Sequence, residues 1–248
     1  MDFQSASGIA LASVQVVIPA LEEEATVGQV VADLRRIGFT RIRVVDNGSV
    51  DRTAELAREA GAEVLIEPVP GYGQACWTGC GRLDPEVEWI LFCDADGSDR
   101  LDDVNLFLEK AREADFILGD RRSRKEGRRH MTFAQNFGNG LATFLIGFGW
   151  GFQYHDLGPL RLIRRSLFES IGMNDRGFGW TLEMQVRAVE ERAAVAEIPV
   201  GYRRRQGGRS KISGTLKGSM TAGIVILKTL ACLWLRRLTR RGKGKGLS

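Results

Sequence analysis

The stretch that most restricts the fold of this chain is Trp89-Ile90-Leu91-Phe92-Cys93-Asp94-Ala95-Asp96. Four apolar residues in succession predict a strand that is buried on both faces. Two carboxylates one residue apart follow the strand and point to the same side of the chain. Carboxylate oxygens are the hard ligands that Mg²⁺ or Mn²⁺ prefers, and such ions complete their shell with phosphate oxygens. The pattern therefore predicts either a metal site or an acidic loop that caps a helix starting at Leu101.

Similar apolar runs recur along the chain and alternate with segments of helical periodicity. The runs predict strands at residues 14–18, 42–45, 64–66, 89–93, 116–118, 160–163 and 195–200. Helices are predicted at residues 25–37, 51–60, 101–114 and 181–191, with a short one after the glycines at 71–73. The apolar segment 133–148 fits either a helix or a packed loop. This alternation predicts an α/β fold with a mainly parallel central sheet and helices on both faces.

Length and composition are those of an ordinary globular chain. Of its 248 residues, 44% are hydrophobic and 27% charged, and no linker or repeat divides the sequence. We therefore expect one domain over residues 12–213 and a C-terminal amphipathic helix with a basic tail over residues 214–248. The four cysteines and two histidines have no zinc spacing, which favours a reduced, cytoplasmic protein. Residues 1–11 lack the basic start and apolar core of a secretory signal.

Positive charge is concentrated in three blocks, although the net charge is only +4. The blocks lie at residues 121–129, 203–211 and 236–245. Such blocks suit phosphates, nucleic acid or an anionic membrane, or they form a solvated surface. A nucleic-acid-binding module is disfavoured, because aromatic residues are not interleaved with the blocks and the module leaves Asp94 and Asp96 unexplained.

Polar or glycine-rich loops follow four of the predicted strands. They are residues 19–23, 46–49, 71–74 and 94–98. In parallel sheets, ligands bind beyond the carboxyl ends of the strands, which meet at one edge. The four loops therefore predict a single binding site along that edge.

These loops, in this order, resemble glycosyltransferase family 2, and within it the dolichyl- or polyprenyl-phosphate hexose synthases. The similarity covers about residues 14–229. The segments that carry it are VIPALEEE (17–24), VVDNGSVDRT (44–53), GYGQA (71–75), DADG (94–97), DLGPLR (156–161), WTLE (180–183) and GGRSK (207–211). The resemblance implies a GT-A-type, Rossmann-like domain that binds a nucleotide sugar.

The resemblance also implies roles for the matching residues. Those implied to border the nucleotide are Pro19, Ala20, Leu21, Glu23, Asp46, Gly71, Gly73 and Asp94. Glu23 would lie near the ribose, Asp46 would accept a hydrogen bond from the base edge, and the two glycines would let the backbone approach the nucleotide closely. The implied ligands of Mg²⁺ or Mn²⁺ are Asp96, Asp94 and Ser98.

The sequence departs from the family pattern near these positions. Glu22 stands where the family usually has Asn, and Asn47 stands where it often has a second Asp. Tyr72 and Gln74 occupy the region of the usual glycine-loop lysine. These changes are compatible with the fold and leave the base and the sugar open.

The acceptor side of the site depends on the chemistry of the acceptor. An alcohol needs a general base, for which Asp156 is the first candidate and Glu183 the second, although both residues fit loop or helix caps equally well. A lipid phosphate is already ionised and needs no base, but cationic residues must then hold two anions together. The candidates for that role are Arg121, Arg128, Arg129, Arg209, Ser210 and Lys211.

The C-terminal stretch 216–235 is apolar but contains Lys217 and Lys228, which disfavours a membrane-spanning helix. An interfacial helix followed by the basic tail is expected, which would place the protein peripherally on the inner face of the cell membrane. A core-packing or dimer-forming helix is the alternative, and the latter would give a homodimer.

The resemblance implies a metal-dependent, inverting glycosyltransferase. It would move a hexose from a UDP- or GDP-sugar to a polyprenyl phosphate. The alternative keeps the donor chemistry but uses a soluble phosphorylated acceptor or a hopanoid-type alcohol.

Overall fold

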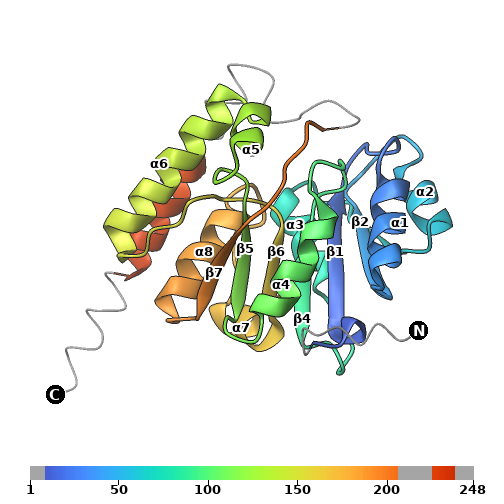
Figure 1. The fold of residues 1–248 in the computed structure, drawn as a ribbon, viewed down its shortest axis with the longest axis horizontal. Coiled ribbons are helices and arrows are strands. Elements are labelled where there is room, and N and C mark those ends of the chain that lie inside the picture. The colour runs from blue at the N-terminus through green and yellow to red at the C-terminus, as the bar shows by residue number, and fades with distance from the viewer. Residues whose placement is uncertain (1–8, 206–224, 238–248) are drawn as a thin grey trace.

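A seven-stranded sheet forms the centre of the computed structural model, which describes residues 9–205 and 225–237 (Figure 1). The strands are β1 (Val14–Ala20), β2 (Arg41–Asp46), β3 (Glu63–Ile66), β4 (Trp89–Phe92), β5 (Phe116–Asp120), β6 (Arg161–Arg164) and β7 (Val195–Pro199). Their order in the sheet is β3-β2-β1-β4-β6-β5-β7. The predicted α/β fold is confirmed, and all seven predicted strands are present.

One strand departs from the parallel arrangement. β1 pairs in parallel with β2 and β4, β2 with β3, and β5 with β7, whereas β6 runs antiparallel to both β4 and β5. The direction of β6 is not visible in the sequence, because the short run Arg161–Arg164 reads the same in either direction. The sheet is therefore mainly parallel, as predicted, with one reversed strand.

The helices connect the strands and cover the sheet. They are α1 (Val27–Ile37), α2 (Thr53–Glu59), α3 (Tyr72–Gly79), α4 (Val104–Lys110), α5 (Lys125–His130), α6 (Phe133–Trp150), α7 (Arg165–Ile171), α8 (Trp180–Glu190) and a helix at residues 225–237. Short 3₁₀ turns lie at Leu11–Ser13 and Leu101–Asp103. The sequence did not predict α5 and α7, since six or seven residues are too few to display a helical period.

The segment that fitted either a helix or a loop is the helix α6. Thr132 and Gln135 form a reciprocal capping box at its start, in which each side chain binds the backbone N–H of the other residue. Gly151 ends it in the left-handed conformation, with φ of 76°. These two local signals fix both ends of an 18-residue helix.

Two apolar clusters lie on the two faces of the sheet, and β4 contributes to both. Trp89 and Leu91 pack into the cluster under α1 and α4, while Ile90 and Phe92 pack into the cluster under α7 and α8. Alternate residues of a strand point to opposite faces, so a strand covered on both faces must be apolar throughout. The run of apolar residues before Asp94 is uninterrupted because both faces of β4 are covered.

The C-terminal helix at residues 225–237 lies beside α6 at one end of the sheet (Figure 1). Leu230 and Leu233 are buried in the second apolar cluster, as the core-packing alternative for this stretch expects. Residues 216–224 of the stretch and the proposed domain boundary between residues 213 and 214 lie outside the described residues. Within residues 9–205 and 225–237, no helix has the length and apolar character needed to cross a membrane.

Candidate active site

The carboxyl ends of β1, β2 and β4 lie next to one another, because these strands are neighbours in the sheet. Pro19 and Ala20, at the end of β1, are in register with Val45 and Asp46 of β2. Leu21 follows half-buried, and Glu23 is buried. The predicted nucleotide-binding residues of the first two loops therefore share one edge of the sheet with the Asp94–Asp96 loop.

Three carboxylates gather after β4 and form what we call the acidic cluster: Asp94, Asp96 and Asp99. The loop is held by its own backbone, since Asp96 Oδ1 accepts from the Ser98 N–H at 2.9 Å and Asp99 Oδ2 accepts from the Asp94 N–H at 3.1 Å. The Tyr72 hydroxyl adds a hydrogen bond to Asp94 Oδ1 at 3.3 Å. The sequence drew attention to the first two carboxylates but not to a role for Asp99.

The acidic cluster carries more negative charge than its neighbours neutralise. Burial, followed by the nearby carboxylates of Asp96 and Asp99, raises the pKa of Asp94 well above its usual value. Burial also raises the pKa of Asp99 to about 6. Such shifts arise where anions are desolvated and close together, and a cation would relieve them.

Arg205 connects the acidic cluster to the loop after β1. Its Nε lies 2.9 Å from Asp96 Oδ2, and its Nη1 donates to Glu23 Oε1 at 2.8 Å. Two of the acidic residues predicted to bind donor and metal are thus joined by one guanidinium. The sequence placed Arg205 only within a basic block, and its position shortly before the two glycines at 207–208 was the available signal.

The chemistry of the acidic cluster fits a divalent cation bound jointly with a substrate. Asp94 and Asp96 offer the hard oxygen donors that Mg²⁺ and Mn²⁺ prefer. Within the described part of the chain, however, no three His, Cys, Asp or Glu side chains are arranged to hold a metal by themselves. Mg²⁺ characteristically takes one or two carboxylates and completes its shell with phosphate oxygens and water. Ser98, also predicted as a ligand, supports Asp96 through its backbone N–H.

The loop after β2 is organised by Asp46 and Asn47. Asp46 Oδ1 accepts hydrogen bonds from both the N–H and the hydroxyl of Ser49. The Asn47 amide donates to the carbonyls of Glu67 and Val69 at 2.9 and 2.7 Å, and its oxygen accepts from the Gly71 N–H at 2.8 Å. Asn47, a departure from the family pattern, therefore ties the second loop of the site to the third.

Gly71 and Gly73 have a packing role that differs from the predicted one. A Cβ at Gly71 would lie 2.4 Å from the Arg176 carbonyl oxygen, and one at Gly73 would lie 2.8 Å from the Asp175 carbonyl oxygen. The Gly73 N–H also donates to the Gly177 carbonyl at 3.0 Å. The glycines are required here because protein backbone approaches them, which explains their presence without invoking a nucleotide.

Asp156 is fully buried and bound to Arg121. Arg121 Nε lies 2.7 Å from Asp156 Oδ2, and Arg121 Nη2 lies 3.0 Å from Asp156 Oδ1. The Arg121 and Leu157 N–H groups and the Asn139 amide also donate to this carboxylate. Burial alone would raise the pKa of Asp156, but Arg121 and the other donors hold it below its usual value. A carboxylate so occupied is a poor proton acceptor, and this geometry disfavours Asp156 as a general base, a role that stays a prediction.

Glu183 lies in the first turn of α8. Both oxygens of its carboxylate already accept hydrogen bonds from the protein. Its Oε1 accepts from Arg187 at 2.7 Å, and its Oε2 accepts from the N–H groups of Asn174 and Asp175 at 2.9 and 2.6 Å. Glu183 therefore fixes the loop that packs against Gly71 and Gly73. The geometry gives this second candidate base a structural role, which the sequence analysis had kept as its alternative.

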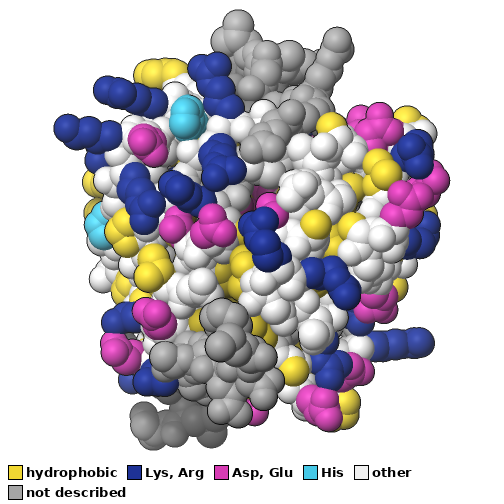
Figure 2. Space-filling view, turned by 45° about the vertical axis from the view of Figure 1, so that its right-hand side comes forward, with side chains coloured by type: hydrophobic (Ala, Val, Ile, Leu, Met, Phe, Trp, Pro, Cys, Tyr) yellow, Lys and Arg dark blue, Asp and Glu magenta, His cyan; other side chains and the backbone are white. Residues whose placement is uncertain are grey.

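The Arg121–Asp156 pair lies beside the acidic cluster. Tyr202 connects the two, because its backbone pairs with Asp99 and its ring centroid lies 5.0 Å from Arg121 Cζ. The predicted phosphate-binding residues Arg128 and Arg129 are exposed on α5. Lys and Arg side chains gather around a few acidic ones in the upper left of the face seen in Figure 2. Arg209, Ser210 and Lys211 lie outside the described residues.

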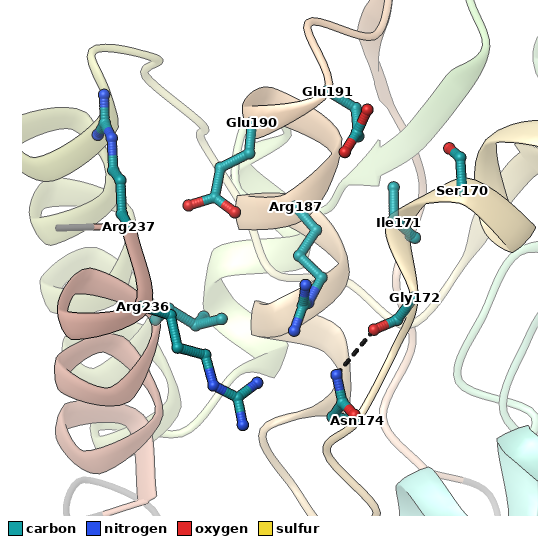
Figure 3. Close-up of a pocket in the computed structure, with 10 residues that line it drawn as sticks. Ser170, Ile171, Gly172, Asn174, Arg187, Glu190, Glu191, Arg236 and Arg237 are labelled. Atoms are coloured by element: carbon teal, nitrogen blue, oxygen red, sulfur yellow. Dashed lines mark hydrogen bonds between the residues drawn. The ribbon is translucent and has the colours of Figure 1, made fainter. Parts of the chain in front are cut away.

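A cavity of about 360 Å³ lies elsewhere, between α8, the end of α7 and the helix at residues 225–237 (Figure 3). Its lining includes Arg187, Glu190 and Arg236. Arg187 is already paired with Glu183, and none of the predicted nucleotide or metal residues lines this cavity. The predicted nucleotide and metal residues lie instead at the ends of β1 and β2 and in the segments that follow β1, β3 and β4.

The fold of this chain is of the GT-A type. The family model for glycosyl transferase family 2 matches residues 15–172, which is more than half of the chain. This chain therefore belongs to glycosyl transferase family 2 and is a glycosyltransferase.

Two relatives illustrate the similarity in sequence. An uncharacterized glycosyltransferase of Mycobacterium tuberculosis (strain H37Rv) is 36% identical over 220 residues, which are 88% of this chain and 98% of the relative. A dolichyl-phosphate hexose transferase of Haloferax volcanii is 32% identical over 195 residues, 77% of this chain and 83% of that protein.

Solved structures share the fold at lower identity. Glucosyl-3-phosphoglycerate synthase from Mycobacterium tuberculosis in complex with phosphoglyceric acid has a TM-score of 0.70 at 20% identity, covering 90% of this chain and 85% of that one. The same enzyme with Mn²⁺, UDP-glucose and phosphoglyceric acid gives a TM-score of 0.68 at 20% identity, covering 92% and 86%. At this identity the similarity concerns the fold alone.

Proposed function

We propose that this chain transfers a hexose from a nucleoside diphosphate sugar to a polyprenyl phosphate, with inversion at the anomeric carbon. The observation that carries the proposal is the juxtaposition of the acidic cluster with the Arg121–Asp156 pair. One side collects three carboxylates, of which Asp96 is paired with Arg205, and on the adjacent side the Asp156 carboxylate is paired with Arg121. That arrangement suits a cation-bound diphosphate next to a second, separately bound phosphate.

The donor would lie along the edge formed by β1, β2 and β4. Asp94 and Asp96 would hold Mg²⁺ or Mn²⁺, which when bound offsets the charge developing on the departing nucleoside diphosphate. Asp96 Oδ2 is engaged by Arg205, so that ion pair must open before this oxygen can bind a cation. The released guanidinium would then be available for a diphosphate oxygen. The ligands UDP and Mn²⁺ in the solved relative support a uridine donor and this choice of metal.

The acceptor argument rests on proton transfer. Asp156 and Glu183, the two carboxylates predicted as bases, are each occupied by an arginine and by backbone N–H groups. A neutral alcohol would need one of them to accept its proton. An ionised phosphate needs neither, and it gains from the positive charge of Arg121 and of the exposed arginines on α5. The hopanoid-type alcohol is therefore disfavoured.

Two phosphorylated acceptors remain, and the relatives support one each. The name of the Haloferax volcanii protein specifies dolichyl phosphate, at 32% identity. The solved synthase contains the soluble acceptor phosphoglyceric acid, at 20% identity. The higher identity and the apolar surface described below favour the lipid phosphate. A peripheral position on the membrane belongs to the same proposal.

A set of matched acceptors tests this function. The full chain is incubated with labelled UDP-glucose or a GDP-hexose and Mn²⁺, in detergent micelles. The acceptors are a polyprenyl phosphate, the corresponding polyprenol and 3-phosphoglycerate. We expect label only in the polyprenyl phosphate, and none when a chelator is present. Equal transfer to the polyprenol would overturn the acceptor argument, and transfer to phosphoglycerate alone would establish the soluble alternative.

A further inference from the structure

The outer side of α6 carries exposed aromatic residues, which we call the phenylalanine stripe: Phe133, Phe137, Phe144 and Phe148. Their side chains are 86%, 64%, 63% and 82% exposed, in that order. Spacings of four, seven and four residues place them on one side of the helix. Ala142 and Ile146 on the opposite side are buried in the core. A row of exposed phenylalanines of this kind marks an interaction surface.

The charge around the stripe is distributed in a particular way. Not one of the 18 residues of α6 is charged. Just before its start, α5 carries the exposed side chains of Lys125, Arg128 and Arg129, against a single Glu126. At its other end, Arg237 of the C-terminal helix donates a hydrogen bond to the Gly149 carbonyl. The stripe therefore begins beside net positive charge on α5, and its other end adjoins both Arg237 and Glu190, whose carboxylate accepts from the Trp150 indole at 2.9 Å.

The C-terminal helix extends this surface. Cβ atoms built at Gly138 and Gly149 would lie 3.7 Å from Ile226 and 3.9 Å from Trp234, so glycines let the two helices approach closely. The contacts advance in the same direction along both chains, which makes the helices parallel neighbours (Figure 1). Trp234 is half exposed. An indole next to arginines is typical of a side chain at a membrane–water interface.

We infer that the phenylalanine stripe is a lipid-facing surface that seats the protein on an anionic bilayer, with α6 lying in the plane of the interface. An interfacial helix buries its apolar side among acyl chains while basic residues contact anionic headgroups. A second copy of the chain fits less well. A partner copy laid parallel along the stripe would bring the basic residues of the two α5 helices together, and α6 itself offers no acidic residue to pair with them.

The same helix connects this surface to the candidate active site. Asn139 lies on the buried side of α6 and donates to Asp156, which holds Arg121. An α-helix with its side chains is about 10–12 Å across. The phosphate of a lipid embedded beneath the stripe would therefore lie within about one helix diameter of Arg121. This last step rests on the proposed function, whereas binding of the stripe to lipid does not.

Vesicle binding tests the inference directly. The full chain is sedimented with vesicles of phosphatidylcholine, with or without phosphatidylglycerol, and in the absence of donor and polyprenyl phosphate. Phe137→Ser/Phe144→Ser is compared with Leu106→Ser, which removes an exposed apolar side chain from α4. We expect the double substitution to lower the partition coefficient into anionic vesicles by about tenfold or more. The reason is that two phenylalanine side chains no longer contribute the free energy of burial among the acyl chains. Leu106→Ser should leave the coefficient within about twofold.

Several outcomes would overturn the inference. In the first, the wild-type chain does not sediment with anionic vesicles. In the second, the double variant is folded and binds the vesicles as well as the wild type does. Light scattering supplies a third, in which the wild type is a dimer and the double variant a monomer, because a second copy would then cover the stripe. Transfer to polyprenyl phosphate in micelles needs no bilayer, so failure of the proposed function is detected separately.

Discussion

The acidic cluster and the Arg121–Asp156 pair are neighbours, yet carboxylates in the two regions have pKa values shifted in opposite directions. Burial and like charge raise the pKa of the half-buried Asp94, whereas Arg121 and other hydrogen-bond donors outweigh burial and lower the pKa of the fully buried Asp156. The more deeply buried carboxylate has the lowered pKa, so depth alone does not decide the direction of the shift, and the charged partner must be known as well. In the proposed function the first region would bind a cation, and Arg121 of the second region would face an anion. Substitutions that remove the charge of one region at a time should therefore distinguish the roles of the two regions.

The largest effect is expected for Asp96→Asn, which removes one charge from the acidic cluster without changing its shape. Metal-dependent transfer should fall by about 10³-fold or more, because the cation loses a carboxylate ligand. The melting temperature should change little, since the amide oxygen still accepts from the Ser98 N–H. Steady-state kinetics with Mn²⁺ and calorimetry measure the two effects. Asp102→Asn, an exposed neighbour, is the control, and an active Asp96→Asn variant in chelator would refute the metal role.

The second effect concerns stability instead of chemistry. Arg121→Ala leaves Asp156 buried without its counter-charge, which should cost about 3–5 kcal/mol in the free energy of unfolding. Urea unfolding measures this loss. The double variant Arg121→Ala/Asp156→Asn should recover part of it, because the uncompensated charge is gone. A single variant as stable as the wild type would mean that Asp156 is not held by Arg121.

The pH dependence of this pair has a definite sign. The folded pKa of Asp156 is below the value of 3.8 for an unperturbed Asp, so its stabilising effect is fully present above pH 3.8. The effect is lost as the pH falls toward the folded pKa. The stability advantage of the wild type over Asp156→Asn should therefore be constant near neutrality and shrink below about pH 4. An advantage that grew on acidification would contradict the assignment.

The two regions also differ in how far the sequence could predict them. The strands and the loops after β1, β2 and β4 are local patterns, so the edge carrying Asp94 and Asp96 was found correctly. Contacts between distant segments were not, as the Arg205–Glu23 hydrogen bond spans 182 positions and Asn139 belongs to no motif. A motif carboxylate such as Glu183 reads as a base until its neighbours are known. Whether an acid is free or occupied is a tertiary property.

A smaller effect tests the hydrogen bonds by which Asn47 connects the loops after β2 and β3. Asn47→Asp keeps the size of the side chain but replaces an amide donor by a carboxylate facing the carbonyls of Glu67 and Val69. Two hydrogen bonds are lost and three oxygens are brought together, so the free energy of unfolding should fall by about 2–3 kcal/mol. Asn105→Asp, exposed on α4, makes the same chemical change as a control. Equal stability of both variants would show that Asn47 does not join the loops.

The smallest effect is expected at the turn that carries Asp156. Glu197 accepts from the backbone N–H groups of His155 and Asp156 at 2.9 and 3.2 Å, and from His155 Nδ1 at 2.7 Å. The hydrogen bond to Glu197 and its charge raise the pKa of His155 above 6.5. The chain has only two histidines, so NMR can follow each imidazole, and Glu197→Gln should return the pKa of His155 toward 6.5.

The raised pKa of His155 also makes the free energy of unfolding depend on pH. A histidine with a raised folded pKa stabilises the fold fully below pH 6.5, and this stabilisation disappears as the pH rises through the folded pKa. Because the His155 side chain is 65% exposed, solvent screening limits the term to about 0.5 kcal/mol. The wild type should therefore exceed Glu197→Gln in stability by slightly more at pH 6 than at pH 8. A difference independent of pH would mean that the charge of His155 does not contribute to stability. Glu197 would then stabilise the turn only through its hydrogen bonds to the backbone N–H groups of His155 and Asp156.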